Sequence, residues 1–247
     1  MHTREEQLKA FERLLEVQEN LRQKCPWDKE QTLESLRPYT IEEVYELASA
    51  IMKKDMTEVK KELGDVLEHI VFYALIASET NEFDIADVCH SLADKLIFRH
   101  PHIYPPEGTE AKKLANSEQV EQQWEQVKLQ EKGGNKTVLA GVPDALPSLI
   151  KAARIQDKAR RVGFDWDEKE QVWAKVKEEI NEFEAEAQKM DADKMEAELG
   201  DVLFSLINAA RLYAINPDNA LEKTNQKFIR RFNYIEQQAL AQRSEER

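Results

Sequence analysis

Apolar side chains recur at intervals of three and four residues along most of the chain, which is the period of an amphipathic α-helix. No comparable stretch alternates apolar and polar positions as a half-buried strand would. The pattern therefore predicts an all-α fold built from long helices. The three clearest apolar stripes are Leu8, Phe11, Leu14, Leu15 and Leu21; Val66, Leu67, Ile70, Val71 and Leu75; and Val202, Leu203, Leu206, Ile207 and Leu212.

Helix-breaking residues are concentrated between positions 101 and 147. This segment holds five of the eight prolines and four of the seven glycines. Such a concentration is typical of a connection between two folded parts. We predict an N-terminal helical domain over 1–104, a linker with a short helix over 105–145, and a C-terminal helical domain over 146–247.

The two halves are related to each other by an internal repeat. The segment LGDVL occurs at 63–67 and again at 199–203, and KLIFR at 95–99 resembles KFIRR at 227–231. We interpret the chain as two tandem copies of one helical bundle. Five acidic positions recur at an offset of 136: Glu42, Glu43, Glu46, Glu62 and Asp65 match Glu178, Glu179, Glu182, Glu198 and Asp201.

The spacing of these acids favours one shared site in each half. On a helix, the three glutamates of EExxE lie within one arc of about 100°, and the two acids of ExxD lie one turn apart. Turns near 53–59 and 189–195, with Thr57 and Asp193 as N-cap candidates, would fold the two motifs against each other. We therefore expect four or five carboxylates to meet.

A solvated acidic face is the ordinary meaning of glutamates on a helix, and it is the alternative here. Two observations favour a metal site instead: the spacing is repeated, and Glu198 and Asp201 lie in an otherwise apolar run. Buried carboxylates need a partner or a cation. Oxygen ligands without His or Cys suit Mg²⁺, or Mn²⁺, rather than zinc.

Basic residues follow each acidic motif at helical spacing. Lys227 and Arg231 are four residues apart with Arg230 beside them, and Lys95 and Arg99 repeat this spacing. They could be surface ion-pair partners or a clamp for phosphate groups. Carboxylates that hold a divalent cation, combined with nearby cations, suit metal-bridged polyphosphate chemistry.

The overall charge limits the choice of partners. The chain has 48 acidic and 35 basic residues, a net charge of -13, which argues against a nucleic-acid duplex as partner. No apolar run approaches the roughly 18 residues of a membrane helix, and the charged N-terminal segment lacks a signal-peptide core. We expect a cytoplasmic protein without a membrane partner, with Cys25 and Cys89 reduced.

The duplicated EExxE–ExxD motif followed by K-x-x-x-R resembles the MazG nucleoside triphosphate pyrophosphohydrolases of the all-α NTP pyrophosphatase superfamily. Further similar segments are LRQKCPWDKEQTLESL at 22–37, FRHPHIY at 98–104 and LPSLIKAARIQDKARRVGFDW at 146–166. The resemblance extends over about residues 8–240 and includes both copies. It implies a homodimer that hydrolyses many NTPs and dNTPs, with Mg²⁺, to a nucleoside monophosphate and pyrophosphate.

The resemblance also implies roles for individual residues. In the second half, the metal ligands would be Glu179, Glu182, Glu198 and Asp201, with Glu178 as a supporting catalytic residue. The nucleotide and its phosphates would contact Lys175, Glu178, Glu179, Asp201, Lys227, Arg230 and Arg231. A second candidate site in the first half would comprise Glu42, Glu43, Glu46, Glu62, Asp65, Lys95 and Arg99.

The two halves are not equivalent. Tyr39 occupies the position of Lys175, and Ala93 occupies that of Asn225, so the first half lacks one cation and one amide. We therefore expect the C-terminal half to be the main catalytic one. Phe164 and Trp166 could contact the base, although aromatic residues at such positions more often pack in a core.

Three alternatives belong to other functional classes. A helical regulatory module could bind Mg²⁺-nucleotide without turnover, since the site is duplicated and its halves are unequal. A di-iron carboxylate bundle would need a pair of ExxH motifs, whereas the chain offers only Asp87-x-x-His90. A coiled coil is disfavoured because no heptad pattern persists.

Overall fold

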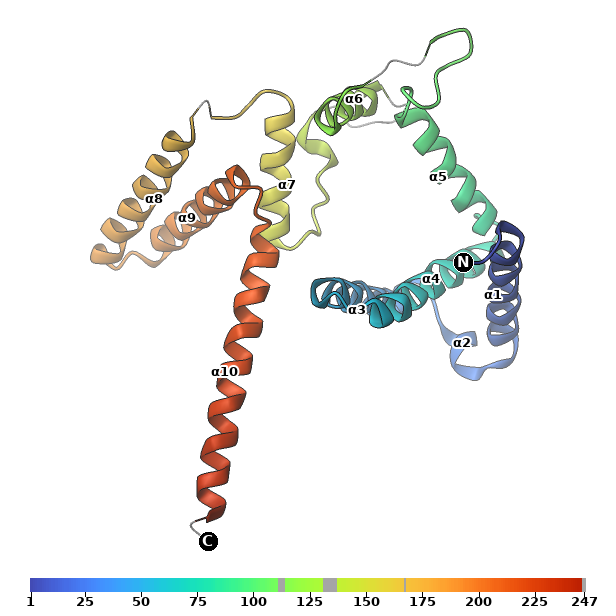
Figure 1. Cartoon of the computed structure of the whole chain (residues 1–247), viewed down its shortest axis with the longest axis horizontal. Helices are drawn as coiled ribbons and strands as arrows, with labels where there is room; N and C mark the ends of the chain where they lie inside the picture. Colours follow the sequence, from blue (N-terminus) through green and yellow to red (C-terminus); the bar gives the residue numbers. More distant parts are fainter. Residues whose placement is uncertain (111–113, 131–136, 167, 246–247) are drawn as a thin grey trace. The chain divides into compact units, whose positions relative to one another are not determined.

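The structure is a computed structural model that describes residues 1–110, 114–166 except 131–136, and 168–245. Every regular element among these residues is a helix, so the predicted all-α fold is confirmed (Figure 1). The elements are α1 (Arg4–Lys24), α2 (Pro26–Glu30), α3 (Leu33–Lys53), α4 (Met56–Glu79), α5 (Ile85–Arg99), α6 (Ser117–Gln130), the 3₁₀ turn η1 (Leu139–Gly141), α7 (Ser148–Arg161), α8 (Lys169–Lys189), α9 (Ala192–Leu212) and α10 (Pro217–Glu245).

The chain forms two compact units, Met1–Pro106 and Glu107–Arg247, which we call unit 1 and unit 2. Helix α6, expected within a linker, packs on α7 of unit 2. A carboxylate oxygen of Glu121 on α6 lies 3.6 Å from Arg160 and 3.5 Å from Arg161. The connection therefore contributes a structural element to unit 2.

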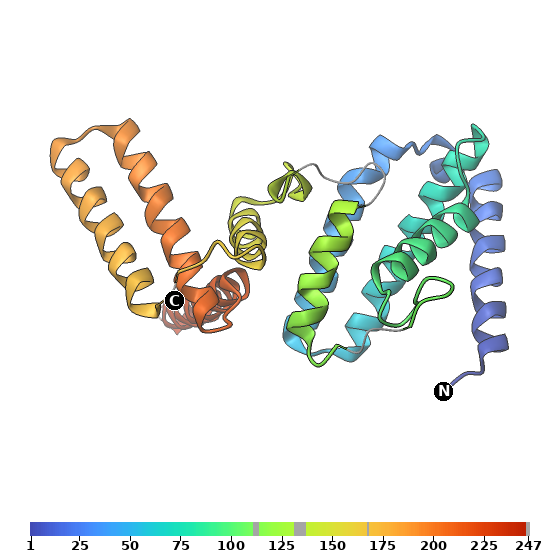
Figure 2. The ribbon, with the colours of Figure 1, turned by 90° about the horizontal axis from the view of Figure 1, so that it is seen from above.

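Each unit is built around an antiparallel helix pair, α3–α4 in unit 1 and α8–α9 in unit 2 (Figure 2). The two turns are closely similar. Lys54 and Met190 end the first helix of each pair with a positive φ of 58°, and Asp55 and Asp191 then cap the second helix. The N-caps expected at positions 57 and 193 are wrong by two residues, because the left-handed residue ends the first helix so abruptly that the next residue already caps the second.

The two pairs differ in polarity at one equivalent position. Unit 2 packs Val172, Val176 and Ala209 into an apolar cluster. In unit 1, Thr40 occupies the position of Val176, and its Oγ1 lies 2.7 Å from Nδ1 of His69 and 2.5 Å from the hydroxyl of Tyr73. At this position the same backbone arrangement therefore supports an apolar contact in unit 2 and a hydrogen-bonded network in unit 1.

Among the described residues, no helix combines the length and the apolar character needed to cross a membrane.

Candidate metal centre and active site

In unit 2, α8 and α9 bring three of the predicted ligands together. Carboxylate oxygens of Glu179, Glu182 and Glu198 all lie within 4.8 Å of one another. Glu179 is buried, with 7% of its surface exposed, while Glu182 faces solvent. Glu178 and Asp201 are both exposed and lie outside this group of three.

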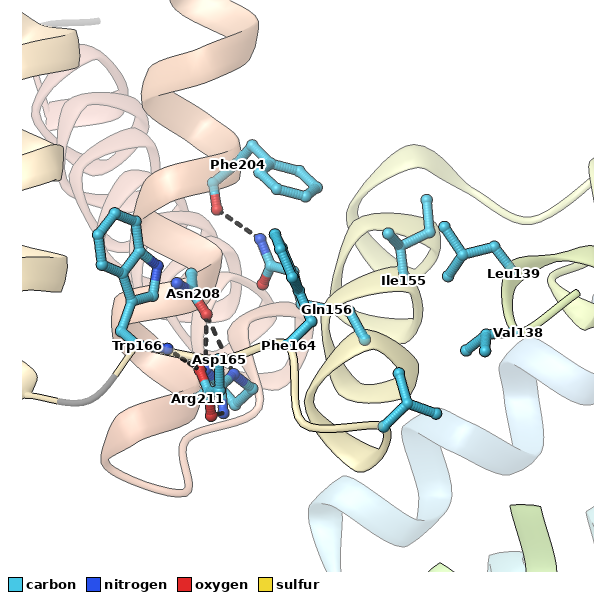
Figure 3. A pocket seen from close by; sticks show the side chains of 12 residues that line it. Val138, Leu139, Ile155, Gln156, Phe164, Asp165, Trp166, Phe204, Asn208 and Arg211 are labelled. Atoms are coloured by element: carbon cyan, nitrogen blue, oxygen red, sulfur yellow. Dashed lines mark hydrogen bonds and ion pairs between the residues drawn. The ribbon is translucent and has the colours of Figure 1, made fainter. Parts of the chain in front are cut away.

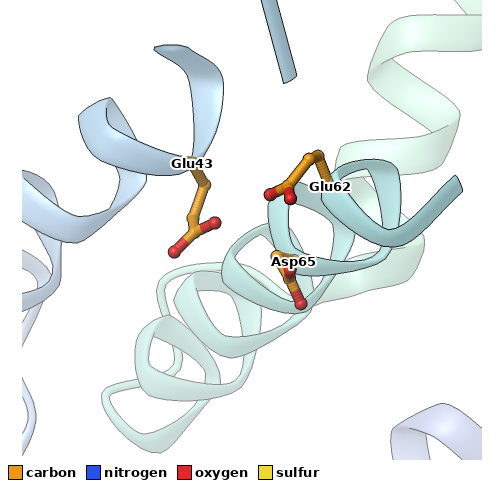
Figure 4. A group of neighbouring side chains, drawn as sticks. All are labelled: Glu43, Glu62 and Asp65. Atoms are coloured by element: carbon orange, nitrogen blue, oxygen red, sulfur yellow. The ribbon is translucent and has the colours of Figure 1, made fainter. Parts of the chain in front are cut away.

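In unit 1, α3 and α4 form a similar but not identical cluster. Here the three oxygens within 4.8 Å belong to Glu43, Glu62 and Asp65 (Figure 4). Glu62 is only 3% exposed, and its Oε2 atom has no hydrogen-bond partner. The third carboxylate of the cluster is therefore Asp65 in unit 1 but Glu182 in unit 2. Glu42 and Glu46 lie outside the unit 1 cluster.

Both clusters are short of positive charge. Burial, and then the negative charges of Asp65, Glu46 and Glu62, raise the pKa of Glu43. Partial desolvation by the neighbouring groups, and then the charges of Glu179 and Glu198, likewise raise the pKa of the exposed Glu182. A divalent cation would supply the missing charge, and donor sets made only of carboxylate oxygens suit a hard cation such as Mg²⁺. The residues present therefore fit a metal.

Each cluster has one lysine ammonium, contributed by different helices. In unit 2, Nζ of Lys175 on α8 lies 2.7 Å from Oε1 of Glu179 and 2.9 Å from Oε1 of Glu178. These hydrogen bonds raise the pKa of Lys175. The ammonium is therefore held beside the carboxylates, where a phosphate oxygen could replace them as its partner.

In unit 1, the ammonium comes from Lys61 on α4. Its Nζ lies 2.9 Å from Oε1 of Glu62 and 3.9 Å from Oδ2 of Asp65. The equivalent position in unit 2 is Ala197. Sequence reasoning missed Lys61, although its four-residue spacing from Asp65 was a signal for this pair.

The predicted phosphate clamp of unit 2 is not assembled with the acids. Lys227, Arg230 and Arg231 lie exposed on α10, which runs away from the α8–α9 pair (Figure 1). Among the described residues, no hydrogen bond or ion pair joins these three to the carboxylate cluster. Lys95 and Arg99 occupy the corresponding helix of unit 1, α5. Their roles remain predictions.

The fold and the clusters define a duplicated helical protein with carboxylate sites suited to hard cations. Comparison with known families identifies the class of protein. Residues 31–104 and 167–235 match the model of the MazG nucleotide pyrophosphohydrolase domain. The chain belongs to this family of hydrolases, and the resemblance noted from its motifs is confirmed.

Relatives extend over most of the chain. It is 41% identical over 236 residues to the nucleoside triphosphate pyrophosphohydrolase of Escherichia coli K12, covering 93% of this chain and 88% of that protein. It is 43% identical over 230 residues to the nucleoside triphosphate pyrophosphohydrolase/pyrophosphatase MazG of Thermotoga maritima, covering 92% and 86%. The crystal structure of a MazG-related protein from Thermotoga maritima matches 47% of this chain and 97% of its own, at 27% identity and a TM-score of 0.41.

Proposed function

We propose that this protein hydrolyses nucleoside triphosphates, with ribose or deoxyribose, to a nucleoside monophosphate and pyrophosphate in the presence of Mg²⁺, mainly in unit 2. The observation that carries the proposal is the convergence of Glu179, Glu182 and Glu198 beside the Lys175 ammonium. Relatives named nucleoside triphosphate pyrophosphohydrolase or MazG support the same reaction.

In this proposal the unit 2 carboxylates hold Mg²⁺, with Asp201 joining them from the next turn of α9. A bound Mg²⁺ would neutralise polyphosphate charge and make a water molecule more acidic. A carboxylate of the cluster accepts the proton of the attacking water, which cleaves the bond between the α- and β-phosphate groups. Lys175 shifts from Glu178 and Glu179 to a phosphate oxygen, and Lys227, Arg230 and Arg231 bind the remaining phosphate charge. Mn²⁺ fits the same oxygen ligands.

The weaker role of unit 1 follows from its substitutions. Tyr39 replaces Lys175, and Lys61 occupies the cluster from the other helix, against the buried Glu62. In unit 1 the ammonium therefore comes from α4, and the helix that carries the first glutamates has no cation in the place of Lys175. We propose that unit 1 contributes less to turnover and serves chiefly in structure or regulation.

The exposed apolar stripes support a homodimer. Leu199, Leu203 and Leu206 on α9 are 45%, 50% and 40% exposed. The equivalent stripe on α4 is exposed as well, and contiguous exposed apolar surface marks an interaction site. We propose that a second copy of the chain covers these helices and holds α10 near the acids. The free thiols of Cys25 and Cys89 support a cytoplasmic location.

The test is a panel of NTPs and dNTPs incubated with Mg²⁺ or Mn²⁺, scored for nucleoside monophosphate and pyrophosphate. Release of both products in equal amounts from several bases is expected, and none is expected in EDTA. Tight Mg²⁺-dependent nucleotide binding without pyrophosphate would instead indicate the regulatory module. Light scattering of the full chain checks the dimer, and Leu203→Glu should yield the monomer.

A further inference from the structure

Unit 2 contains a pocket of about 600 Å³ that is distinct from the carboxylate cluster (Figure 3). It lies between α7 and α9 and is closed on one side by the segment that follows α7. Its volume is within the range of small-molecule sites, about 300–1,000 Å³. Three aromatic side chains line it, Phe164, Trp166 and Phe204, and each is at least 43% exposed. Such rings could cover a flat apolar ligand.

The end of α7 positions two of these rings. Gly163 adopts a φ of +86°, which a residue with a Cβ rarely adopts. The N–H of Gly163 donates to the carbonyl of Arg160 at 2.9 Å, and that of Phe164 donates to the carbonyl of Ala159 at 3.0 Å. This Schellman arrangement turns the chain back across the end of the helix. Phe164 and Trp166 are therefore held by a defined turn.

An ion pair fixes the same segment to α9. Asp165, between the two aromatic residues, accepts two hydrogen bonds from the guanidinium of Arg211, one of them from Nη1 at 2.9 Å. Burial alone would raise the pKa of Asp165, but the hydrogen bonds from Arg211 and from the Trp166 N–H lower it below its usual range. The aromatic wall is thus anchored at both ends.

Gln156, which lines the pocket, has a buried amide oxygen without a hydrogen-bond partner. Nε2 of Gln156 donates to the carbonyl of Phe204 at 2.8 Å, and only the nitrogen end of the amide can make that bond. Its Oε1 is therefore directed elsewhere, and it has no hydrogen-bond partner although Gln156 is only 8% exposed. Unpartnered buried acceptors are rare in folded proteins. An N–H group of a ligand would satisfy this one.

A second amide supplies complementary donors. Oδ1 of Asn208 accepts hydrogen bonds from Nε of Arg211 at 3.1 Å and from Nη2 at 2.9 Å. Arg211 therefore fixes the orientation of this amide, so that its Nδ2 donors are directed away from the guanidinium. The pocket consequently offers both an acceptor, from Gln156, and donors, from Asn208. The edge of a nucleobase carries the matching N–H and acceptor groups.

The pocket and the acidic cluster share helix α9, which contributes residues to both. Asp201, Phe204 and Asn208 are spaced by three and four residues, so they follow one face of α9. Seven residues of helix separate Asp201 from Asn208, a rise of roughly 10 Å. Phosphate groups at Asp201 and a base at Asn208 would therefore lie along the same face of α9, with Gln156 facing the base from α7.

In unit 1 a buried side chain occupies the position that borders the pocket in unit 2. Phe72 occupies the position of Asn208 and is only 1% exposed. The guanidinium of Arg22 lies 5.8 Å from the centre of its ring. Glu68 occupies the position of Phe204, so an aromatic wall residue is lost as well. The open pocket is therefore not a general consequence of the repeated fold.

We propose that this pocket binds the base of the nucleoside triphosphate, with Gln156 and Asn208 contacting its polar edge and the aromatic side chains covering its faces. The inference rests on the proposed function, since the phosphates are placed at the unit 2 acids. It makes Gln156 and Asn208 determinants of base preference.

The test compares Asn208→Phe and Gln156→Leu with the wild type on ATP, GTP, CTP, UTP and ribose 5′-triphosphate, which has no base. We expect KM for at least one NTP to rise about tenfold or more in each variant, with kcat changed far less and with KM for ribose 5′-triphosphate unchanged. Titration calorimetry with the α,β-methylene analogues of the same NTPs measures the loss of binding without turnover.

Gln18→Leu is the matched control, because Gln18 is the equivalent buried amide of α1 in unit 1, where VQENLR aligns with IQDKAR. It should leave KM for all bases unchanged. If NTPs are hydrolysed but Asn208→Phe and Gln156→Leu both keep wild-type KM and analogue affinity for all four bases, the pocket inference is overturned and the proposed function stands. If no NTP yields pyrophosphate, the proposed function fails, and the analogue titrations still decide whether the pocket binds a base.

Discussion

Units 1 and 2 share one helix pair, one turn and one set of acids, yet they use equivalent positions differently. Unit 1 buries the ring of Phe72, whereas unit 2 has Asn208 at the equivalent position, at the edge of a pocket. Thr40 joins a polar network with His69, whereas Val176 packs in an apolar core. Equal backbones therefore do not imply equal sites.

The lysines show the same divergence within the sites themselves. Lys61 on α4 pairs with the buried Glu62 and, at 3.9 Å, with Asp65, whereas Lys175 on α8 pairs with the buried Glu179 and with Glu178. The side chain of Lys61 is 59% exposed and that of Lys175 is 37% exposed. The ammonium therefore comes from the second helix of the pair in unit 1 and from the first helix in unit 2.

The largest expected difference is in catalysis. Glu179→Ala should lower kcat on the order of 1000-fold, because it removes a ligand from the proposed main metal site. Asp201→Ala should lower kcat to a similar extent, and the equivalent changes Glu43→Ala and Asp65→Ala should cost much less. Pyrophosphate release measures the rates, and circular dichroism checks that each variant is folded. Equal losses in the two units would contradict the asymmetry, and wild-type rates in Glu179→Ala and Asp201→Ala would contradict the site.

Stability should show the opposite asymmetry. Phe72→Ala should lower the free energy of unfolding of unit 1 by about 3 kcal/mol or more, because it leaves a cavity under Arg22. Asn208→Ala should cost about 1 kcal/mol, since its side chain borders space that is already open. Urea unfolding followed by circular dichroism measures both. A cost for Asn208→Ala as large as that for Phe72→Ala would show that the unit 2 pocket is closed in solution.

The fold and the acids could be predicted because the relevant information is local or periodic. Helical periodicity gives the element type, and the constant offset identifies equivalent glutamates. The unit 2 pocket could not be predicted in the same way. It depends on the turn at Gly163 and on a hydrogen bond between Gln156 and Phe204, which are 48 residues apart. The choice of Asp65 in one cluster and Glu182 in the other is also a property of side-chain packing between helices.

A smaller effect should separate the two lysines. Lys175→Met should raise KM for NTPs about tenfold, because it removes a cation placed to meet phosphate oxygens. Lys61→Met should leave KM nearly unchanged and lower the melting temperature instead, since Glu62 loses its ion-pair partner. Steady-state kinetics and thermal melts of both variants test this. If KM rose as much for Lys61→Met as for Lys175→Met, both units would bind the nucleotide, and the proposed difference between the lysines would be wrong.

The smallest effect concerns protons that compete with the cation. The folded-state pKa values of Glu43 and Glu182 are raised above the ordinary 4.5, so the folded protein binds these protons more tightly than the unfolded chain does. The resulting stability is fully present below pH 4.5 and is lost as the pH rises through the raised values. Mg²⁺ should replace it at neutral pH. The rise in melting temperature caused by Mg²⁺ should therefore be larger at pH 7.5 than at pH 5. Glu182→Gln and Glu43→Gln should each reduce this rise by the contribution of the cluster that carries the change. Equal Mg²⁺ shifts at the two pH values would show that these carboxylates do not bind the cation.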